Sequence, residues 1–286
     1  TNFGIVRLLS GDFTRMVLIA IVIALPISFL IAQRWLESFA FRIDALMLVT
    51  MLVSVTDPNK GLVAVAVYTV ALSMASMIEM PFRAMNQIIS PSISYAWKEN
   101  DLKKVNEVYS KSTETMIIVG LFIFLGIWLC IDDVIKILPE KFEGVKTVFF
   151  WLGLGKFFNV ACGSNGQVLI NSPKYLMYTL FTVIGLLFTF ISNYFLISAM
   201  ETEGAALATA ITYFLFNLTI FIYLYAKYKF QPFKWNNLLT ILLSIVIYIM
   251  LFKIDANHHI LNIIIKSSLT IILFWFVVIK FKFSED

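Results

Sequence analysis

The chain has 286 residues, of which 60% are hydrophobic and only 14% charged, and its mean hydropathy is +0.87. Soluble domains are about half apolar and about a quarter charged, so this composition excludes an ordinary soluble protein and indicates an integral membrane protein. The net charge of +4 is small and the lysines are scattered between apolar runs, which excludes the basic surface typical of nucleic-acid binding.

Long apolar runs separated by short polar segments dominate the sequence. A helix needs about 17 to 25 apolar residues to cross the roughly 30 Å hydrocarbon core of a bilayer. We therefore predict an all-α, polytopic helical bundle of about eight to nine transmembrane helices. The predicted helices cover residues 16–32, 45–57 (a short run), 61–81, 113–131, 145–169, 175–198, 204–227, 235–253 and 260–280.

The segments between these runs contain proline, glycine and clustered polar residues, which are typical of turns. Residues 98–111 combine closely spaced charges with a helix-forming composition, which predicts a short helix on the membrane surface. The first apolar run is not followed by a small-residue cleavage motif, so we do not expect a cleavable signal peptide. The main breaks are DPNK at 57–60, residues 89–112, INSPK at 170–174, METEG at 200–204 and KFQPFKW at 229–235.

Basic residues are divided unequally between alternate loops. Eleven lie in the loops of one face and five in those of the other, and the richer face is expected to be cytoplasmic. This places the 83–111 loop and the C-terminus in the cytoplasm. The first set is Arg83, Lys98, Lys103, Lys104, Lys111, Lys174, Lys227, Lys229, Lys234, Lys280 and Lys282, and the second is Lys60, Lys136, Lys141, Lys146 and Lys253.

The region before residue 44 differs from the remainder of the chain. It contains four of the five arginines and no lysine. In the predicted orientation, a spanning helix at 16–32 puts Arg7 and Arg15 outside, against the preference of basic residues for the cytoplasmic face. These two facts predict that segments 1–43 and 44–286 have different origins.

Two sets of polar residues at helical spacing stand out inside the apolar runs. The first falls at i, i+4, i+7 and i+11 and lies on one face if the helix continues through Pro81. Polar groups at membrane depth cost a few kcal/mol each unless they face protein or water, so the two sets favour a water-filled cavity. The first set is Glu79, Arg83, Asn86 and Ser90, and the second is Lys156, Asn159, Gly163 and Gln167.

An alternative interpretation is that Arg83 and Gln167 lie at helix ends and extend toward the cytoplasmic interface. Bending is predicted at Pro81 and within GSNG at 163–166, because proline removes a backbone hydrogen bond and glycine loosens a turn. We therefore assign Pro81, Gly163 and Gly166 as candidate hinges for alternating access. A fixed kink in a packed bundle explains the same residues.

The predicted spans lack the patterns of an enzyme. A membrane enzyme acting on sugars or phosphates needs clustered carboxylates, a nucleophile with its base, or a metal site, and acidic residues are nearly absent from the spans. Cys130 and Cys162 lie in apolar runs and are expected to be small buried residues. The adjacent His258 and His259 lack the i, i+4 spacing of a helical metal pair, and we expect them to be exposed. We predict no catalytic residue, no metal site and no cofactor.

The N-terminal segment carries NFGIVRLLSGDFTRMVLIAIVIALPISFLIAQRWLESFAFRI at residues 2–43. It resembles the C-terminal region of FtsX/MacB-type ABC exporter permeases. In that family an amphipathic VRLLSxDF segment leads into a transmembrane helix with an internal proline and then a WLxxFAxRI anchor. The resemblance covers about the first sixth of the chain.

The remainder carries IDALML, VAVYTVA, IEMPFRAMNQIISPSIS, LGLGKFFNVACGSNGQVLINS and METEGAALATAI, in that order. Their order and spacing over residues 44–286 resemble the C-terminal half of a Wzx-type polysaccharide flippase. These flippases belong to the multidrug/oligosaccharidyl-lipid/polysaccharide (MOP) exporter superfamily. A complete flippase has a full amino-terminal lobe where this chain has permease-like sequence.

The flippase resemblance implies a transporter of the bacterial inner membrane that acts in polysaccharide, O-antigen or lipopolysaccharide biosynthesis. Its cargo would be an undecaprenyl-diphosphate-linked oligosaccharide, with Arg83 and Lys156 neutralising the diphosphate or anionic sugars. Membrane lipids and polysaccharide-assembly proteins are the other expected partners. The competing hypotheses are a permease fragment of an ABC exporter, which needs an ATPase partner, and a non-functional fusion of the two segments.

Overall fold

The computed structural model describes residues 58–254 and 258–280, and these residues form helices without a strand. The predicted all-α class is therefore confirmed for this part of the chain. The predicted spans at 16–32 and 45–57, and the predicted boundary at residue 43, lie outside the described residues. The elements are α2 (Pro58–Ser76), α3 (Met80–Lys98), α4 (Leu102–Ile137), the 3₁₀ turn η1 (Glu140–Phe142), α5 (Val145–Ala161), α6 (Asn165–Ile170), α7 (Tyr175–Tyr228), α8 (Trp235–Phe252) and α9 (His259–Lys280).

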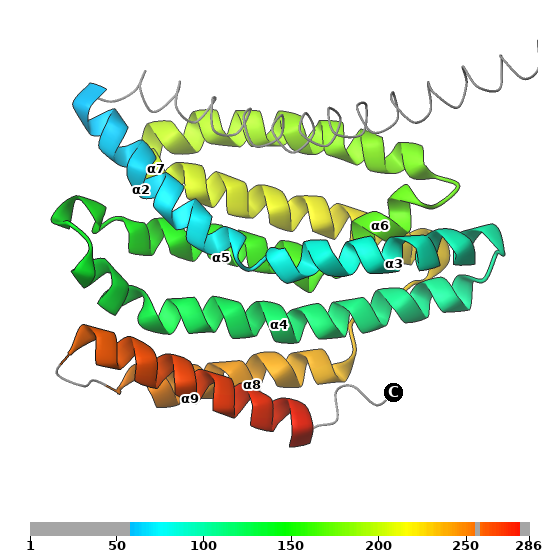
Figure 1. The fold of residues 1–286 in the computed structure, drawn as a ribbon. Helices are drawn as coiled ribbons and strands as arrows, with labels where there is room; N and C mark the ends of the chain where they lie inside the picture. Colours follow the sequence, from blue (N-terminus) through cyan, green and yellow to red (C-terminus); the bar gives the residue numbers. More distant parts are fainter. Residues whose placement is uncertain (1–57, 255–257, 281–286) are drawn as a thin grey trace, which may run out of the picture. The chain divides into compact units, whose positions relative to one another are not determined.

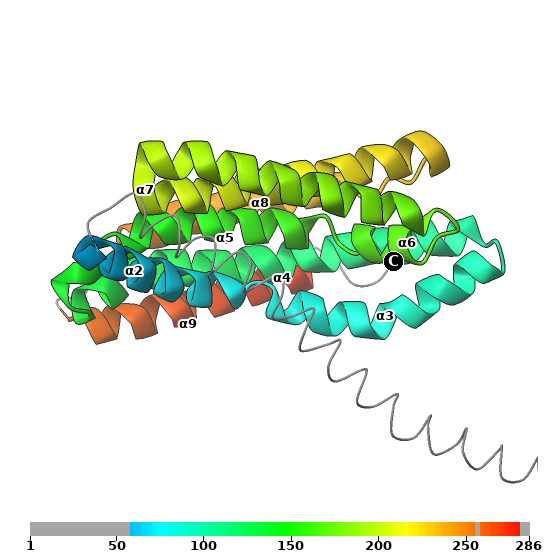
Figure 2. The same cartoon turned by 90° about the horizontal axis from the view of Figure 1, so that it is seen from above.

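Helices α4 and α5 organise the packing of the described residues. Helix α5 packs against α2, α4 and α7 (Figures 1 and 2). Helix α4 packs against α5, α8 and α9. Helix α3 packs on α4 and on the short α6. The predicted polar residues of α5 therefore lie between α2 and α7, and α4 lies beside α8 and α9.

Among the residues that the structure describes, α4, α7 and α8 are long and apolar enough to cross a membrane, and α2 with α3 forms a fourth candidate span bent by 46°. The apolar part of α9, His259–Phe274, is shorter. Helix α8 exposes apolar residues and buries polar ones, the reverse of a soluble helix: Ile249 is 59% exposed, whereas Thr240 and Ser244 are buried. An apolar exterior around a partly polar interior is the arrangement expected of a protein surrounded by lipid.

Helix α7 is a hairpin of two antiparallel halves. Its regular geometry is broken at Glu201, which has φ 49° and ψ −123°. The halves contact each other through Thr189 and Thr212, whose hydroxyl oxygens are 3.3 Å apart. At the turn, a Cβ on Gly204 would lie 1.9 Å from the carbonyl oxygen of Leu196. The predicted division into 175–198 and 204–227 is confirmed, and only glycine fits where the halves separate.

The helix predicted at 61–81 ends before Pro81, so the condition that one helix continues through this proline is not met. Helix α2 stops at Ser76, residues 77–79 form turns, and α3 starts at Met80 with Pro81 in its first turn. Proline is tolerated there because the first-turn N–H groups have no intrahelical partner. The spacing of the first polar set survives, since the Arg83 N–H donates to the Glu79 carbonyl at 3.0 Å. A second proline, Pro91, lies inside α3.

The predicted helix at 145–169 is two helices, because the chain turns at residues 162–164 between α5 and α6. Gly163 adopts φ +58° at this turn. A Cβ at Gly163 would lie 2.3 Å from the Thr113 hydroxyl oxygen and 2.8 Å from the Thr113 backbone. The interruption predicted at GSNG is thus present, and glycine is required both by the backbone angle and by the contact with α4.

The predicted surface helix at 98–111 is wrong as a separate element. Helix α4 is continuous from Leu102 to Ile137, so it includes both most of this segment and the predicted span at 113–131. Asp101 caps it by accepting a hydrogen bond from the Lys104 N–H at 3.0 Å. Residues 89–98, expected in a break, belong to α3. The charged residues of this segment form the solvated end of a longer helix and do not mark a separate element.

The connecting segments gather at two opposite ends of α4. At one end, the indole ring of Trp97, near the end of α3, packs on Phe230 of the α7–α8 connection. Its indole nitrogen donates to the Val168 carbonyl of α6. At the other end, Asp132 binds Lys146 and Asp133 binds His259. These contacts bring together some of the connections predicted to share a membrane face.

A buried carboxylate shared by two cations

Glu79 occupies the turn between α2 and α3 and is 5% exposed. Its position follows from the sequence, because the helix break before Pro81 leaves this carboxylate at a helix start that packs toward α5. One carboxylate oxygen, Oε2, accepts from Lys156 Nζ at 3.0 Å and from Arg83 Nη2 at 3.3 Å. The other, Oε1, accepts from Asn159 Nδ2 at 2.9 Å. The structure thus brings four of the predicted site residues into one network.

The two cations on Glu79 differ sharply in exposure. The Lys156 side chain is 9% exposed, whereas that of Arg83 is 67% exposed. Lys156 also donates to the Tyr213 hydroxyl at 2.8 Å and sits 4.7 Å from the centre of its ring. Lys156 therefore links α5 to the α2–α3 turn and to α7. Among the described residues, Glu79 is the ion-pair and hydrogen-bond partner of the Arg83 guanidinium.

A chain of amides extends the network across α5, α6 and α7. Asn217 Nδ2 donates to Asn159 Oδ1 at 3.0 Å, and Asn165 Nδ2 donates to Asn217 Oδ1 at 2.9 Å. Asn165 Oδ1 in turn accepts from the Gly166 N–H at 2.6 Å. Buried amides linked in this way satisfy one another and fix the α5–α6 turn against the second half of α7.

The remaining predicted residues lie farther along α3 and α6. Asn86 accepts from the Ser164 hydroxyl at 3.0 Å, so it contacts the α5–α6 turn and not Glu79. Gln167 is on α6, where its side-chain oxygen accepts from Asn171 at 3.4 Å, and Asn171 also donates to Ser90 at 3.3 Å. The second polar set is therefore split by the α5–α6 turn and does not form one continuous face.

Arg83 lies in the first turn of α3, beside the bend between α2 and α3, and not at the lysine-rich end of that helix. Arg83 is therefore at the opposite end of α3 from Lys98, which argues against the interpretation that it extends to the cytoplasmic interface. The carboxylate of Glu79 carries one negative charge against the two positive charges of Lys156 and Arg83. The cluster therefore has a net positive charge, and its exposed member can accept an anionic ligand.

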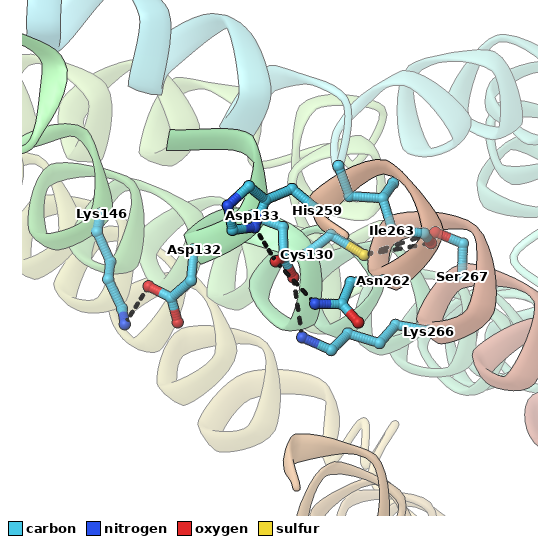
Figure 3. A network of polar contacts seen from close by, with 9 residues as sticks. All are labelled: Cys130, Asp132, Asp133, Lys146, His259, Asn262, Ile263, Lys266 and Ser267. Carbon is cyan, nitrogen blue, oxygen red and sulfur yellow. Dashed lines mark hydrogen bonds and ion pairs between the residues drawn. The ribbon is translucent and has the colours of Figure 1, made fainter. Parts of the chain in front are cut away.

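A second buried carboxylate, Asp133, was not among the predicted site residues (Figure 3). Asp133 is 3% exposed on α4, and its Oδ2 accepts from Lys266 Nζ of α9 at 3.0 Å. Its Oδ1 accepts from Asn262 at 3.1 Å and contacts the His259 ring nitrogen at 3.1 Å. The predicted span ended at residue 131, which put Asp133 in a loop, and the lysine within the 260–280 run was the available signal.

The histidines and cysteines behave mostly as expected. His258 and His259 are both exposed, although His259 also binds Asp133. Cys130 is buried, with its sulfur 3.5 Å from the Ser267 hydroxyl, and Cys162 is half-buried; both are free thiols. Within residues 58–254 and 258–280, no group of three or more histidine, cysteine or acidic side chains is arranged to hold a metal ion.

Comparison of the chain with protein-family models, with curated proteins and with solved structures found no match. The geometry around Glu79 and Asp133 therefore provides the basis for a functional proposal, together with the resemblance noted from the sequence.

Proposed function

We propose that this chain is a membrane transporter that moves a lipid-linked oligosaccharide or polysaccharide unit across the bacterial inner membrane. The observation that carries the proposal is the shared carboxylate of Glu79, which binds a buried Lys156 and an exposed Arg83 at one helix break. Because one anion serves two cations, Arg83 can turn to a diphosphate while Lys156 keeps Glu79 neutralised. An enzyme is not favoured, since these residues bind and neutralise charge without supplying a nucleophile and base.

The topology we propose has seven crossings among the described residues: α2 with α3, α4, α5 with α6, each half of α7, α8 and α9. Alternate connections then fall at opposite ends, and the contacts of Trp97 at one end and of Asp133 at the other support this arrangement. With the predicted runs at 16–32 and 45–57, the total becomes nine, the upper value of the predicted range. The lysine-rich end and the C-terminus are cytoplasmic in this proposal.

The helix breaks support a role in transport. The break at 77–79 contains Glu79 itself, and the break at 162–164 is followed directly by Asn165, which donates to Asn217. Transporters use interrupted helices at their binding sites because the freed backbone and the bend permit movement. We propose that Gly163 and the segment around Pro81 are the hinges. The fragment and fusion alternatives concern residues 1–43, and no contact in the described residues favours either.

Binding of a polyprenyl-diphosphate-linked sugar to the purified full chain tests this function. We expect Arg83→Ala to weaken binding by about tenfold or more, because a charge-assisted contact to phosphate contributes about 1.5–3 kcal/mol. Arg83→Lys should recover only part of the affinity, since a lysine cannot form the bidentate contact. Native mass spectrometry with a polyprenol of the same length, lacking the diphosphate, separates headgroup binding from chain binding.

Lys103→Ala is a matched control, because Lys103 is an exposed cation on α4 away from Glu79. Equal affinity of wild type, Arg83→Ala and Lys103→Ala for the diphosphate lipid would contradict the proposed site. Transport itself is measured by reconstituting the chain in vesicles and following the appearance of a fluorescent diphosphate lipid in the opposite leaflet. No movement above protein-free vesicles would contradict the transporter function.

A further inference from the structure

The connection between α7 and α8 places exposed lysines among exposed aromatic side chains. Lys227 lies in the last turn of α7, Lys229 follows the helix in the left-handed conformation, and both are exposed. Trp235, the first residue of α8, is 82% exposed, and Tyr225 is 48% exposed. This combination lies at the boundary between two candidate spans, α7 and α8.

The connection is fixed in place by the neighbouring helices. The indole of Trp97 contacts the ring of Tyr228 at 5.0 Å in an edge-to-face geometry and that of Phe230 at 6.1 Å. The Gln231 N–H donates to Asn106 at 3.2 Å, and the Gln231 carbonyl accepts from Ser110 at 3.3 Å. The exposed lysines and Trp235 therefore project from a segment whose backbone is anchored on α3 and α4.

The lysines at this end differ in their ionic partners. Lys104 and Lys111 share Glu107, and Lys234 binds Glu114 at 3.3 Å. In the described part of the chain, no carboxylate forms an ion pair with Lys227 or Lys229, and the Lys229 ammonium lies 5.4 Å from the centre of the Tyr225 ring. Their charges are available to an external anion.

The opposite end of the bundle has a different charge balance. There Lys146 is paired with Asp132, and Glu140 and Glu143 flank Lys141 in and beside the η1 turn. An anionic ligand at that end would meet carboxylates. Lys227 and Lys229 therefore differ from Lys146, which has an ion-pair partner, and from Lys141, which lies beside Glu140.

We propose that Lys227, Lys229 and Trp235 form a binding surface for the headgroup of an anionic phospholipid. The two ammonium groups donate to the phosphate, while the indole lies at the headgroup level between water and the acyl chains. The inference rests on the proposed membrane location and concerns a site separate from Glu79 and Arg83. It gives the lysine-rich end a specific lipid partner and would hold the α7–α8 connection at the membrane surface.

Fluorescence quenching of Trp235 tests this proposal directly. The full chain is reconstituted in phosphatidylcholine vesicles that contain an equal minor fraction of either brominated phosphatidylglycerol or brominated phosphatidylcholine. The signal of Trp235 is taken as the difference between the chain and its Trp235→Phe variant. Each lysine near a membrane surface is expected to enrich an anionic lipid by about fivefold, so brominated phosphatidylglycerol should quench Trp235 several-fold more strongly.

In the paired variant Lys227→Gln/Lys229→Gln, brominated phosphatidylglycerol and brominated phosphatidylcholine should quench Trp235 equally. Lys141→Gln/Lys253→Gln, which removes the same charge at the opposite end, should leave the preference unchanged. Equal quenching by both lipids in the unaltered chain, or a preference that survives Lys227→Gln/Lys229→Gln, overturns the lipid site. An equal loss in both paired variants also overturns it, since the effect would then be one of net charge.

The failure of this proposal and that of the transport proposal are distinguishable. Arg83→Ala should leave the quenching preference intact, because Arg83 lies on the first turn of α3, far along the helix from its lysine-rich end. A chain that shows the lipid preference but no binding of the diphosphate lipid would retain this surface and lose the proposed function. Absence of quenching by either brominated lipid would overturn both the lipid site and the proposed position of the α7–α8 connection.

Discussion

Glu79 and Asp133 are both buried carboxylates paired with a buried lysine, but their surroundings differ. Asp133 lies within the continuous helix α4, and its lysine lies within α9. Glu79 lies at a helix break, and its lysine is on α5, which ends a few residues later. The first pair joins two uninterrupted helices, whereas the second joins segments that already bend.

The two carboxylates also differ in their remaining partners. Asp133 receives Lys266, Asn262 and the His259 ring, so both of its oxygens are occupied by donors from α9. Glu79 holds a second cation, Arg83, whose side chain is mostly exposed. A carboxylate with a spare cation can lose one partner without being left unpaired. The comparison teaches that the Asp133 site is suited to fixing helices and the Glu79 site to exchanging a partner.

The largest effect is expected from Lys266→Met, which removes the buried lysine from Asp133 and leaves it only Asn262 and the His259 ring. Breaking a buried ion pair by removing one partner costs about 3–5 kcal/mol in the free energy of unfolding. The double variant Asp133→Asn/Lys266→Met should recover much of this loss, because no buried charge then remains. Thermal unfolding of the purified chain in detergent measures the difference.

Cys130 provides a local readout for the same change. Its sulfur is covered by Ile263 and Ser267 of α9, so its reaction with a maleimide should accelerate when α9 loosens from α4. The background is Cys162→Ala, which leaves Cys130 as the only thiol of the chain. Asp132→Asn, which alters the half-exposed neighbour of Asp133, should leave the rate unchanged. A stable Lys266→Met chain with a protected Cys130 would show that the pair does not fix α9.

Lys156→Met should cost less, about 2 kcal/mol in the free energy of unfolding, because Arg83 and Asn159 remain on Glu79. Adding Arg83→Ala to Lys156→Met removes the spare cation and should bring the cost near that of Lys266→Met. Denaturation of the three variants side by side tests the comparison. If Lys156→Met alone were as damaging as Lys266→Met, Arg83 would not be a functional substitute, and the two carboxylates would be equivalent.

Gly163→Ala tests whether the α5–α6 break is imposed by glycine. We expect a loss of about 1–2 kcal/mol, because the added methyl group requires a left-handed backbone and meets Thr113. Gly126→Ala, on the continuous helix α4, has no atom within 4 Å of its new Cβ and should be neutral or slightly stabilising. Unfolding measurements on both variants separate the effect of the break from that of losing a glycine. Equal stabilities would mean that the turn tolerates a side chain.

The sequence predicted most helices and part of the Glu79 network for physical reasons that the structure makes visible. Hydropathy located the α7 hairpin, α8 and α9, because their exposed faces are apolar. Helical spacing found Glu79 and Arg83, since that spacing is local to one helix. The pairing of Glu79 with Lys156 across different helices, and the contribution of Tyr213, depend on packing that spacing within one segment does not specify.

Asp133 was missed for a related reason. Hydropathy ends a predicted span at the first charges, but α4 continues past Asp132 and Asp133 for another turn. A buried carboxylate can extend an apolar helix only if a cation from another helix meets it, and Lys266 does so from far along the chain. The lysine inside the 260–280 run was the one indication, since a charge there requires a partner.

Arg83→Ala should have the smallest effect on stability, about 0.5 kcal/mol or less, because an exposed ion pair contributes little to folding. Its Glu79 partner keeps Lys156 and Asn159, so no buried charge is left unpaired. Binding of a diphosphate lipid by Arg83→Ala should nevertheless fall. In Lys266→Met, by contrast, any loss of lipid binding should follow from loss of stability. The two quantities are measured on the same preparations, by thermal unfolding and by lipid binding.

A drop in stability as large as that of Lys156→Met would show that Arg83 supports the fold as a permanent partner of Glu79. In that case the guanidinium would not be free to turn to a ligand, and the distinction between the two carboxylates would disappear.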